Sequence, residues 1–293
     1  MPMSRGQQIV MWKETLGLCR LTPEETVVIL TGEHSRPENV DAATTAVQEI
    51  GVRMSRLHIF ESSRPLAENR PAMEAMKLTD MMIDLAGIHW LRGGEQETIM
   101  HAGTRILYVT EPPDVLARMR PSEDDKRRCS AAGRALKKAK EMRVTSEAGT
   151  DLRVRLGDFP VLNEYGYADE PGHFDHWGAG HVHTFPNEGT ANGTVVFQPG
   201  DIVILPYCRY IHDTVRVEVR DGFVTGIEGG LDAKLMRDWL NDNKAAPDDR
   251  DPLAVSHLGW GLNPQALWYG IALNGDTPER SRAAARTFPG NFL

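Results

Sequence analysis

The first apolar run of the chain is Thr26-Val27-Val28-Ile29-Leu30, a short stretch that opens an alternation of apolar and helical segments. Further apolar runs follow at 52–60, 81–85 and 105–109. Segments of helical composition separate these runs, at 38–50, 72–76 and 95–101. Strands that alternate with helices are typical of βαβ units, so we predict a mostly parallel sheet that is covered on both faces.

The turn after the first run lacks the glycine pattern of a dinucleotide site. It reads Thr31-Gly32-Glu33-His34, where a Gly-x-Gly-x-x-Gly motif would be needed to hold a pyrophosphate. We therefore expect a Rossmann-like scaffold that does not bind NAD.

The sequence pattern changes at about residue 141. A long helix with an acidic start and a basic end is expected over 121–140. Hairpin patterns then appear at 142–156 and at 215–227, and the second of them contains Asp221-Gly222, a strong signal for a tight hairpin turn.

This change divides the chain into two predicted domains. Residues 1–141 are expected to form an α/β scaffold domain, and residues 142–293 a mainly antiparallel α+β domain. The predicted fold class is therefore α/β, with a Rossmann-like first domain and a second domain of a different type.

Composition excludes several classes of protein. The 293 residues include 33 Lys and Arg against 41 Asp and Glu, a formal net charge of −8, so a nucleic-acid partner is not expected. No apolar run approaches the length of a membrane span, and no apolar signal segment follows the first residues, so we expect a cytoplasmic protein without a membrane partner. Cys19, Cys129 and Cys208 are widely spaced, as is typical of reduced, buried thiols.

Histidines are concentrated in one segment. Four of the ten lie between residues 173 and 183, close to Glu164 and Asp175 in a stretch rich in glycine and aromatic residues. Imidazole and carboxylate groups in one pocket suit proton transfer, or a metal with open coordination positions. A closed zinc site is not expected, because the spacing differs and no cysteine is near. Each histidine taken singly could equally be a surface or hydrogen-bonded residue.

Two further histidines have supporting contexts. His257 lies in a strand-like run that ends in Gly259-Trp260-Gly261, where glycines allow a tight turn or a close approach to a ligand. His89 follows the third apolar run, at the position where open α/β sheets bind ligands.

The residues around these histidines closely resemble the 2,5-dihydroxypyridine 5,6-dioxygenase family. The resemblance extends from the first helix to the last residue and is carried by the runs 111–119, 122–128, 164–172, 175–177 and 256–262. The family belongs to nicotinic acid degradation and is related to the aminopeptidase T metallopeptidases. The resemblance implies a non-haem Fe(II) enzyme that uses O2 to open the ring of 2,5-dihydroxypyridine, giving N-formylmaleamic acid. A homo-oligomer is also expected.

The resemblance also implies roles for individual residues. His257 matches the family's iron-binding histidine. His89, Glu164 and His176 match residues that line the substrate pocket, with His176 or His89 as the candidate base, and we expect all of these to converge in one pocket. The remaining substrate-binding candidates are Tyr165, Tyr167, Trp177, His181 and His183. For the three aromatic residues, core packing is an equally good interpretation.

One element of the family pattern has no counterpart here. The family's iron is also held by a His-x-Asp pair further along, whereas this sequence stops at Asn291-Phe292-Leu293. One expectation is a chain that is truncated at its C-terminus; another is a natural short form that has lost iron or recruits other ligands. Two other functional interpretations stay open: a metallo-aminopeptidase of the aminopeptidase T type and a non-catalytic short homologue.

Overall fold

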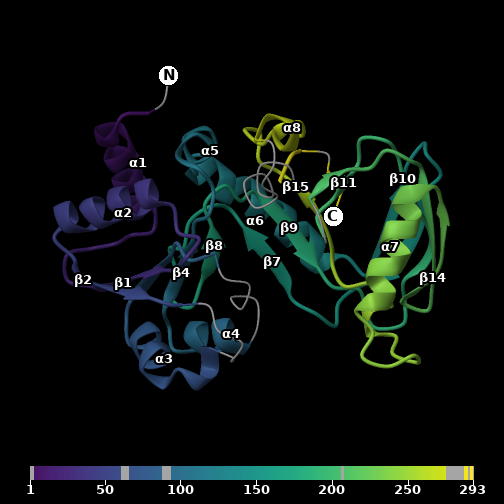
Figure 1. The fold of residues 1–293 in the computed structure, drawn as a ribbon, viewed down its shortest axis with the longest axis horizontal. Helices are drawn as coiled ribbons and strands as arrows, with labels where there is room; N and C mark the ends of the chain where they lie inside the picture. Colours follow the sequence, from purple (N-terminus) through teal and green to yellow (C-terminus); the bar gives the residue numbers. More distant parts are fainter. Residues whose placement is uncertain are drawn as a thin grey trace. The chain divides into compact units, whose positions relative to one another are not determined.

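A five-stranded parallel sheet organises the first part of the chain (Figure 1). The computed structural model describes residues 3–60, 66–87, 94–205, 208–274, 287–289 and 291–292. Across the sheet the strands are β2 (Arg53–His58), β1 (Thr26–Thr31), β3 (Met81–Asp84), β4 (Arg105–Tyr108) and β8 (Phe174–His176). All neighbouring strands are parallel, so the predicted parallel sheet is confirmed. The fifth strand, β8, was not predicted; it comes from the histidine-rich segment and pairs with β4.

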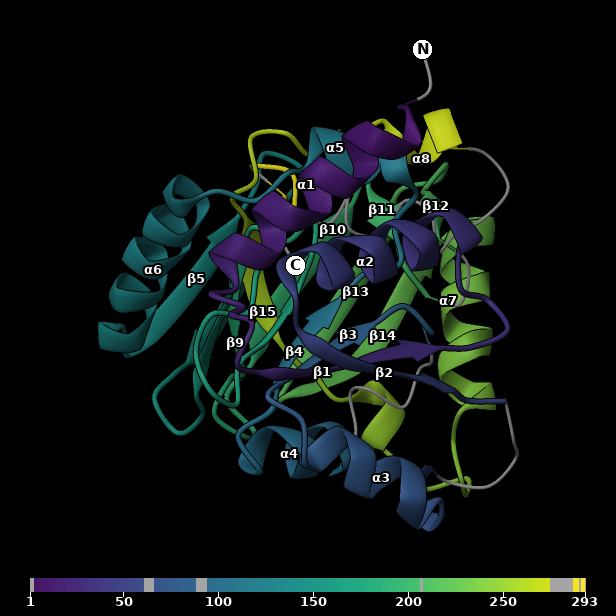
Figure 2. The same cartoon turned by 90° about the vertical axis from the view of Figure 1, so that its left-hand side faces the viewer.

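Helices cover both faces of this sheet (Figures 1 and 2). On one side lie α1 (Arg5–Leu18) and α2 (Pro37–Ile50), and on the other α3 (Arg70–Lys77) and α4 (Gly94–His101). Successive strand residues face opposite sides: Ile29 packs into the core beneath α1 and α2, whereas Leu30 packs into the core beneath α3 and α4. Burial on both faces explains why the central strand β1 is a continuous apolar run instead of an alternating one.

Local sequence signals explain where several helices begin and end. Ser4 and Gln7 form a capping box at the start of α1, and Gly51 ends α2 in a left-handed conformation with φ of 88°. The predicted long helix is confirmed as α6 (Glu123–Lys138), with acids in its first turn and lysines in its last. The shorter helices before it are the 3-10 turn η1 (Leu66–Glu68) and α5 (Pro113–Arg118).

An antiparallel sheet follows in the second part of the chain. Its strands are β14 (Phe223–Gly229), β13 (Val215–Arg220), β10 (Asn192–Phe197), β6 (Asp151–Arg155) and β5 (Glu141–Thr145). Both predicted hairpins are confirmed, β5 with β6 and β13 with β14. Asp221 and Gly222 both have positive φ, 48° and 84°, as a tight two-residue hairpin turn requires. The helix α7 (Leu231–Asp242) lies against this sheet (Figure 1).

A smaller sheet carries several of the predicted site residues. It consists of β15 (Leu258–Gly261), β9 (His181–Thr184) and β7 (Val161–Glu164), in that order. The strand-like run expected over 255–261 is thus shorter, and His257 immediately precedes β15. The remaining elements are β11 (Ile202–Val203), β12 (Arg209–Tyr210), η3 (Asp251–Leu253) and α8 (Gly270–Asn274).

The residues group into two compact units. The first comprises 1–129, 164–180 and 262–267, and the second 130–163, 181–261 and 268–293. The parallel sheet belongs to the first unit and the large antiparallel sheet to the second. The boundary at residue 141, as a division between separate domains, stays a prediction.

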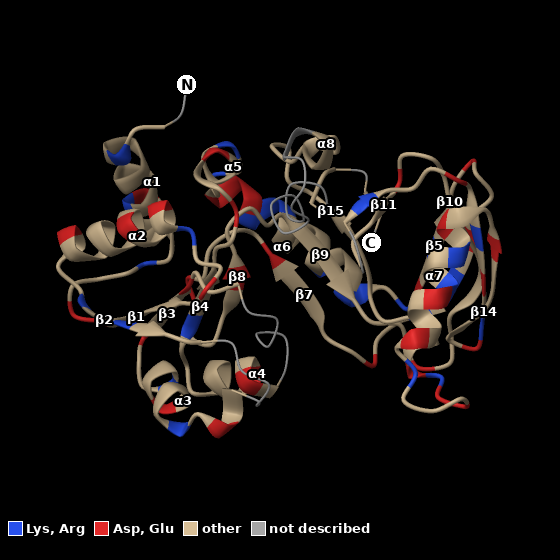
Figure 3. Ribbon diagram, viewed as in Figure 1, with Lys and Arg blue, Asp and Glu red and all other residues tan. Residues whose placement is uncertain are grey.

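Charged residues of both signs are interspersed along the ribbon in each unit (Figure 3). In the part of the chain that the structure describes, none of the helices is both long enough and apolar enough to cross a membrane.

Candidate functional site

Glu164 and His176 form the closest pair among the predicted site residues. Each is the last residue of its strand, Glu164 in β7 and His176 in β8. The Nδ1–H of His176 donates to Oε2 of Glu164 over 2.5 Å, and both side chains are largely buried, 5% and 12% exposed. A short, charge-assisted bond away from water holds the ring in one orientation. With Nδ1 committed to Glu164, Nε2 is the ring atom suited to take up or release a proton.

Asp175 binds the backbone next to this pair. Its side chain is fully buried, and its two oxygens accept the backbone N–H groups of Tyr165 at 2.7 Å, Gly166 at 2.9 Å and His176 at 2.7 Å. Burial and the nearby charge of Glu164 raise the pKa of Asp175 well above its usual range, although the three N–H bonds act in the opposite direction. The carboxyl group thus organises the backbone on either side of the pair.

Further hydrogen-bonded polar groups connect Tyr165 with Lys126 of α6. The Tyr165 hydroxyl donates to Asp169 over 2.7 Å, and the His173 ring lies 3.3 Å from the same hydroxyl. Lys126 donates to Asp169 over 2.6 Å. Burial opposes ionisation of Asp169, but the bonds from Lys126 and Tyr165 outweigh it and lower the Asp169 pKa. Burial also lowers the pKa of His173, so this ring is favoured in its neutral form.

The three-stranded sheet gathers three more of the predicted histidines. His181 and His183 alternate along β9 and therefore point the same way, with their rings stacked 5.2 Å apart. The ring of His257 lies 5.5 Å from that of His183, because β15 runs antiparallel to β9 and places Gly259 opposite His183. His181 is buried, whereas His257 is exposed.

The glycines after His257 allow a close approach to protein backbone. A Cβ on Gly259 would meet the Val182 carbonyl oxygen at 2.1 Å, and a Cβ on Gly261 would meet the Phe288 carbonyl oxygen at 2.3 Å. The sequence pattern predicted either a tight turn or an approach to a ligand. These contacts show instead that the glycines fit β15 against its neighbours, and so fix the backbone that carries His257.

A group of side chains in the first unit has the donors and the spacing of a metal centre. Ligand atoms of Glu164, Asp175 and His176 lie within 4.8 Å of one another. Because both oxygens of Asp175 already accept backbone N–H groups, that carboxylate is better suited to holding the backbone than a metal ion. Imidazole with carboxylate is a donor set that suits first-row metals such as iron.

The predicted aromatic wall lies in the hydrophobic core. Tyr165, Tyr167 and Trp177 are 5%, 2% and 1% exposed and belong to the apolar cluster that α1 and α2 cover. Trp177 packs edge-on against Trp12 at 4.9 Å and donates its ring N–H to the Leu116 carbonyl. These contacts favour the core interpretation for the three residues, and their contact with a substrate stays a prediction. His89 lies outside the described residues.

Sequence reasoning missed the roles of Asp175, Asp169 and Lys126. The sequence pattern marks Asp175 only as a carboxylate within the histidine-rich segment, and it marks Lys126 only as a residue of the predicted long helix. A signal was available for Asp175, because an acid that precedes the most promising histidine can accept that residue's own N–H. Its contacts with Tyr165 and Gly166 depend on the fold.

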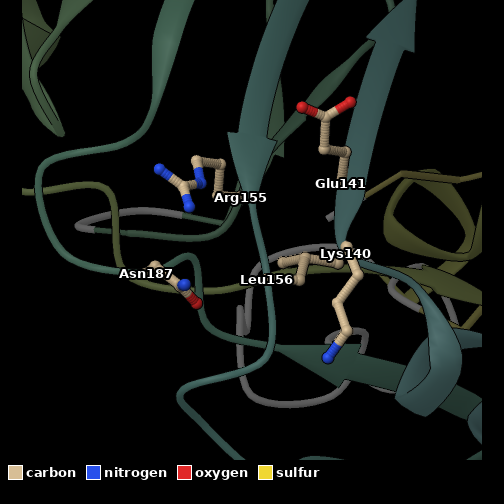
Figure 4. A pocket seen from close by; sticks show the side chains of 5 residues that line it. All are labelled: Lys140, Glu141, Arg155, Leu156 and Asn187. Atoms are coloured by element: carbon tan, nitrogen blue, oxygen red, sulfur yellow. The ribbon is translucent and has the colours of Figure 1, made fainter.

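A separate pocket of about 680 Å³ lies in the second unit (Figure 4). It is lined by Lys140, Glu141, Arg155, Leu156 and Asn187, which differ from the predicted site residues. The charged side chains that line it are exposed, so water screens their interactions.

The α/β fold, with a buried imidazole–carboxylate pair, has features of an enzyme. The sequence model of the 2,5-dihydroxypyridine 5,6-dioxygenase family matches residues 7–293. The chain belongs to this family, as the resemblance predicted, and is therefore a member of a group of ring-cleaving dioxygenases.

Individual relatives agree with this assignment. The chain is 39% identical, over 308 aligned positions, to a 2,5-dihydroxypyridine 5,6-dioxygenase from Pseudomonas putida KT2440; the match covers all of this chain and 86% of the relative. A solved structure of 2,5-dihydroxypyridine dioxygenase from the same organism superposes with a TM-score of 0.93 at 38% identity, over 99% of this chain and 86% of that one. The expected fold class is confirmed.

A more distant likeness supports the fold alone. AmpT from Thermus thermophilus has a TM-score of 0.59 at 11% identity, over 95% of this chain and 84% of that chain. The dioxygenase interpretation is therefore favoured over the aminopeptidase one.

Proposed function

We propose that this protein is an Fe(II)-dependent dioxygenase that opens the ring of 2,5-dihydroxypyridine between C5 and C6, and that the product is N-formylmaleamic acid, formed during nicotinic acid degradation. The observation that carries the proposal is the full-length similarity to relatives named for this reaction. The buried Glu164–His176 pair supports it, because a dihydroxylated ring must lose a hydroxyl proton before it can bind a metal well.

The residues present suit iron. His257, together with the stacked His181 and His183, supplies imidazole groups in one part of the second unit. We propose His257 as an iron ligand. When bound, Fe(II) would supply the Lewis-acid and redox chemistry that ring opening by oxygen requires.

The protein's own part of the chemistry is proton transfer at a fixed atom. His176 accepts the proton of a substrate hydroxyl at Nε2, while Nδ1–H remains bonded to Glu164. Glu164 stabilises the imidazolium that results and keeps the ring from turning. Because the pair is nearly buried, its interaction is screened little by water. His89 is the other candidate base, and its role is a proposal based on its position in the sequence.

The direct test is turnover by the purified chain. The protein is loaded with Fe(II) without air and then mixed with 2,5-dihydroxypyridine in aerated buffer, while loss of substrate and uptake of oxygen are followed together. We expect equal amounts of both to be consumed, and a formyl amide in the product. Loss of the substrate without oxygen uptake, or no loss at all by iron-loaded protein, would exclude the proposal.

A parallel incubation with peptide amides separates the dioxygenase from an aminopeptidase. We expect no peptide hydrolysis with iron, zinc or cobalt added. Peptide cleavage together with inert 2,5-dihydroxypyridine would reverse the assignment. If both substrates remain intact in protein that holds metal, the chain is a non-catalytic homologue.

We also infer a cytoplasmic location and a homo-oligomer. Cys19, Cys129 and Cys208 are buried and form no disulfide within the described part of the chain, as is typical of proteins from a reducing compartment. Light scattering of the purified chain tests the oligomeric state.

A further inference from the structure

The Asp175 side chain binds the backbone next to both members of the Glu164–His176 pair. Tyr165, whose N–H it accepts, directly follows Glu164, and Asp175 directly precedes His176. One fully buried carboxyl group therefore ties the end of β7 to the end of β8. The 2.5 Å bond between Glu164 and His176 lies immediately beyond this tie.

The geometry of these bonds needs a carboxylate in particular. Three N–H donors converge on two oxygens, with Oδ2 facing Tyr165 and Oδ1 facing Gly166 and His176. An asparagine offers one oxygen and one NH2 group, so one backbone N–H would face another donor. Loss of an acceptor at a buried site leaves that donor unsatisfied, which favours movement of the segment.

The turn that follows Glu164 is constrained from a second side. Gly166 has φ of 105°, and a Cβ at this position would lie 2.7 Å from Pro121. The Cys129 thiol on α6 donates to the Glu164 carbonyl over 3.4 Å. The turn is thus packed against α6 and its preceding loop, and Asp175 fixes its other side.

We propose that Asp175 is a positioning residue for the dioxygenase reaction: its carboxyl group does not touch the substrate, but holds Glu164 and His176 at bonding distance. The role in turnover rests on the proposed function. The structural part, which concerns the coupling between Glu164 and His176, does not.

The first test measures this coupling without any activity. Urea unfolding of the full chain is compared for the parent, Glu164→Ala, His176→Ala and the double variant, and the cycle is repeated in an Asp175→Asn background. We expect a measurable interaction between positions 164 and 176 in the parent, and its loss in the Asp175→Asn background. An equal interaction in both backgrounds would overturn the proposal, whether or not the protein turns over 2,5-dihydroxypyridine.

The second test uses kinetics with a matched control. Asp169→Asn removes a buried carboxylate from the neighbouring network but leaves the N–H bonds of Asp175 in place. In iron-loaded protein, we expect Asp175→Asn to lower kcat about a hundred-fold with little change in KM, because a small misplacement of reacting groups is costly. Asp169→Asn should change kcat only a few-fold. Equal losses from both variants at equal loss of thermal stability would show a merely structural role.

A second variant covers the case in which Asp175→Asn does not fold. Gly166→Ala displaces the same turn through its contact with Pro121 and keeps the carboxylate intact. We expect it to lower kcat in the same direction with iron retained. Unchanged kcat in a folded Gly166→Ala protein would contradict the proposal. If the parent enzyme leaves 2,5-dihydroxypyridine unchanged, the proposed function is wrong. The unfolding cycle would still show whether Asp175 couples Glu164 to His176.

Discussion

The imidazole of His176 and the carboxylate of Glu164 meet at 2.5 Å, although twelve residues separate them in the chain. The bond joins the last residues of two strands that belong to different sheets. Glu164 ends one strand and His176 ends the other. The backbones of the two strands therefore fix the positions of both side chains. A paired, buried imidazole with one committed nitrogen is a suitable general base.

Replacement of this base should slow the reaction without releasing the metal. We expect His176→Ala to reduce kcat between about a hundred-fold and ten-thousand-fold, the usual contribution of general acid–base catalysis. Glu164→Gln should cost less if Glu164 acts only on the ring, since an amide oxygen can still accept the Nδ1–H bond. Steady-state kinetics beside iron analysis of each variant checks this. Loss of iron with His176→Ala would assign that residue to the metal.

Replacement of His257, unlike that of His176, should release the metal. We expect His257→Ala to lose iron and turnover together, because the resemblance assigns this residue to the metal and its ring lies next to His183. The control is His101→Ala at the exposed end of α4, which should keep both. Iron content is measured after gel filtration. Full iron in His257→Ala protein would move the assignment to His181 and His183.

Much of the fold could be predicted because its signals are local. The run at 26–30, the acids and lysines at the ends of α6, and Asp221-Gly222 each specify their own structure through patterning, the helix dipole or turn geometry. β8 could not be predicted in this way. It is three residues long, and its identity as a strand comes from pairing with β4, far away in sequence.

The sequence indicates candidate residues but not their contacts. The density of histidines marks His176, His181 and His183 as candidates. The family resemblance adds Trp177 as a substrate-binding candidate, and in the structure Trp177 packs against Trp12 of α1. The residues next to Trp177 in the sequence do not indicate that a helix from the start of the chain covers it. The role of Asp175 is not evident from neighbouring residues either. Two of its three hydrogen-bond partners, Tyr165 and Gly166, lie ten and nine residues earlier in the chain.

The close packing of β15 on β9 gives a stability prediction. Gly259→Ala would place a Cβ 2.1 Å from the Val182 carbonyl oxygen and 2.6 Å from the His183 Cβ. Neither atom can yield without moving a strand, so we expect a loss of roughly 1–3 kcal/mol in unfolding free energy. The iron affinity should fall as well, because β15 carries His257. Urea unfolding and metal titration measure the two effects.

Gly226→Ala is the matched control for this variant. Gly226 also lies in a strand, β14, but its added Cβ would meet only Glu218 atoms at 3.8 Å or more. We expect this substitution to change the unfolding free energy by less than about 0.5 kcal/mol. Equal changes in unfolding free energy at both positions would mean that the close contacts of Gly259 do not cause the loss of stability.

A last prediction concerns Asp84, the fully buried final residue of β3. Burial raises its pKa to about 7, against a smaller opposing effect of N–H groups such as that of Ala86. In the unfolded chain the pKa is about 3.9, so between about pH 4 and pH 7 the folded protein keeps a proton that the unfolded chain has lost. Stability must therefore fall as the pH rises through this window and level off above pH 7.

Asp84→Asn should remove this contribution, because an amide stays neutral and keeps an oxygen for the Ala86 N–H. We expect the variant to gain on the parent by up to about 4 kcal/mol between pH 4 and pH 7, the equivalent of a shift of about three pH units. Asp80→Asn should show no trend across this window, because bonds from Thr26 lower the Asp80 pKa, so its contribution is complete above about pH 4 and is lost only at lower pH. Urea unfolding at pH 4.5, 6 and 7.5 distinguishes the two variants. A constant difference between Asp84→Asn and the parent at all three pH values would mean that Asp84 is ionised in the folded protein throughout this range.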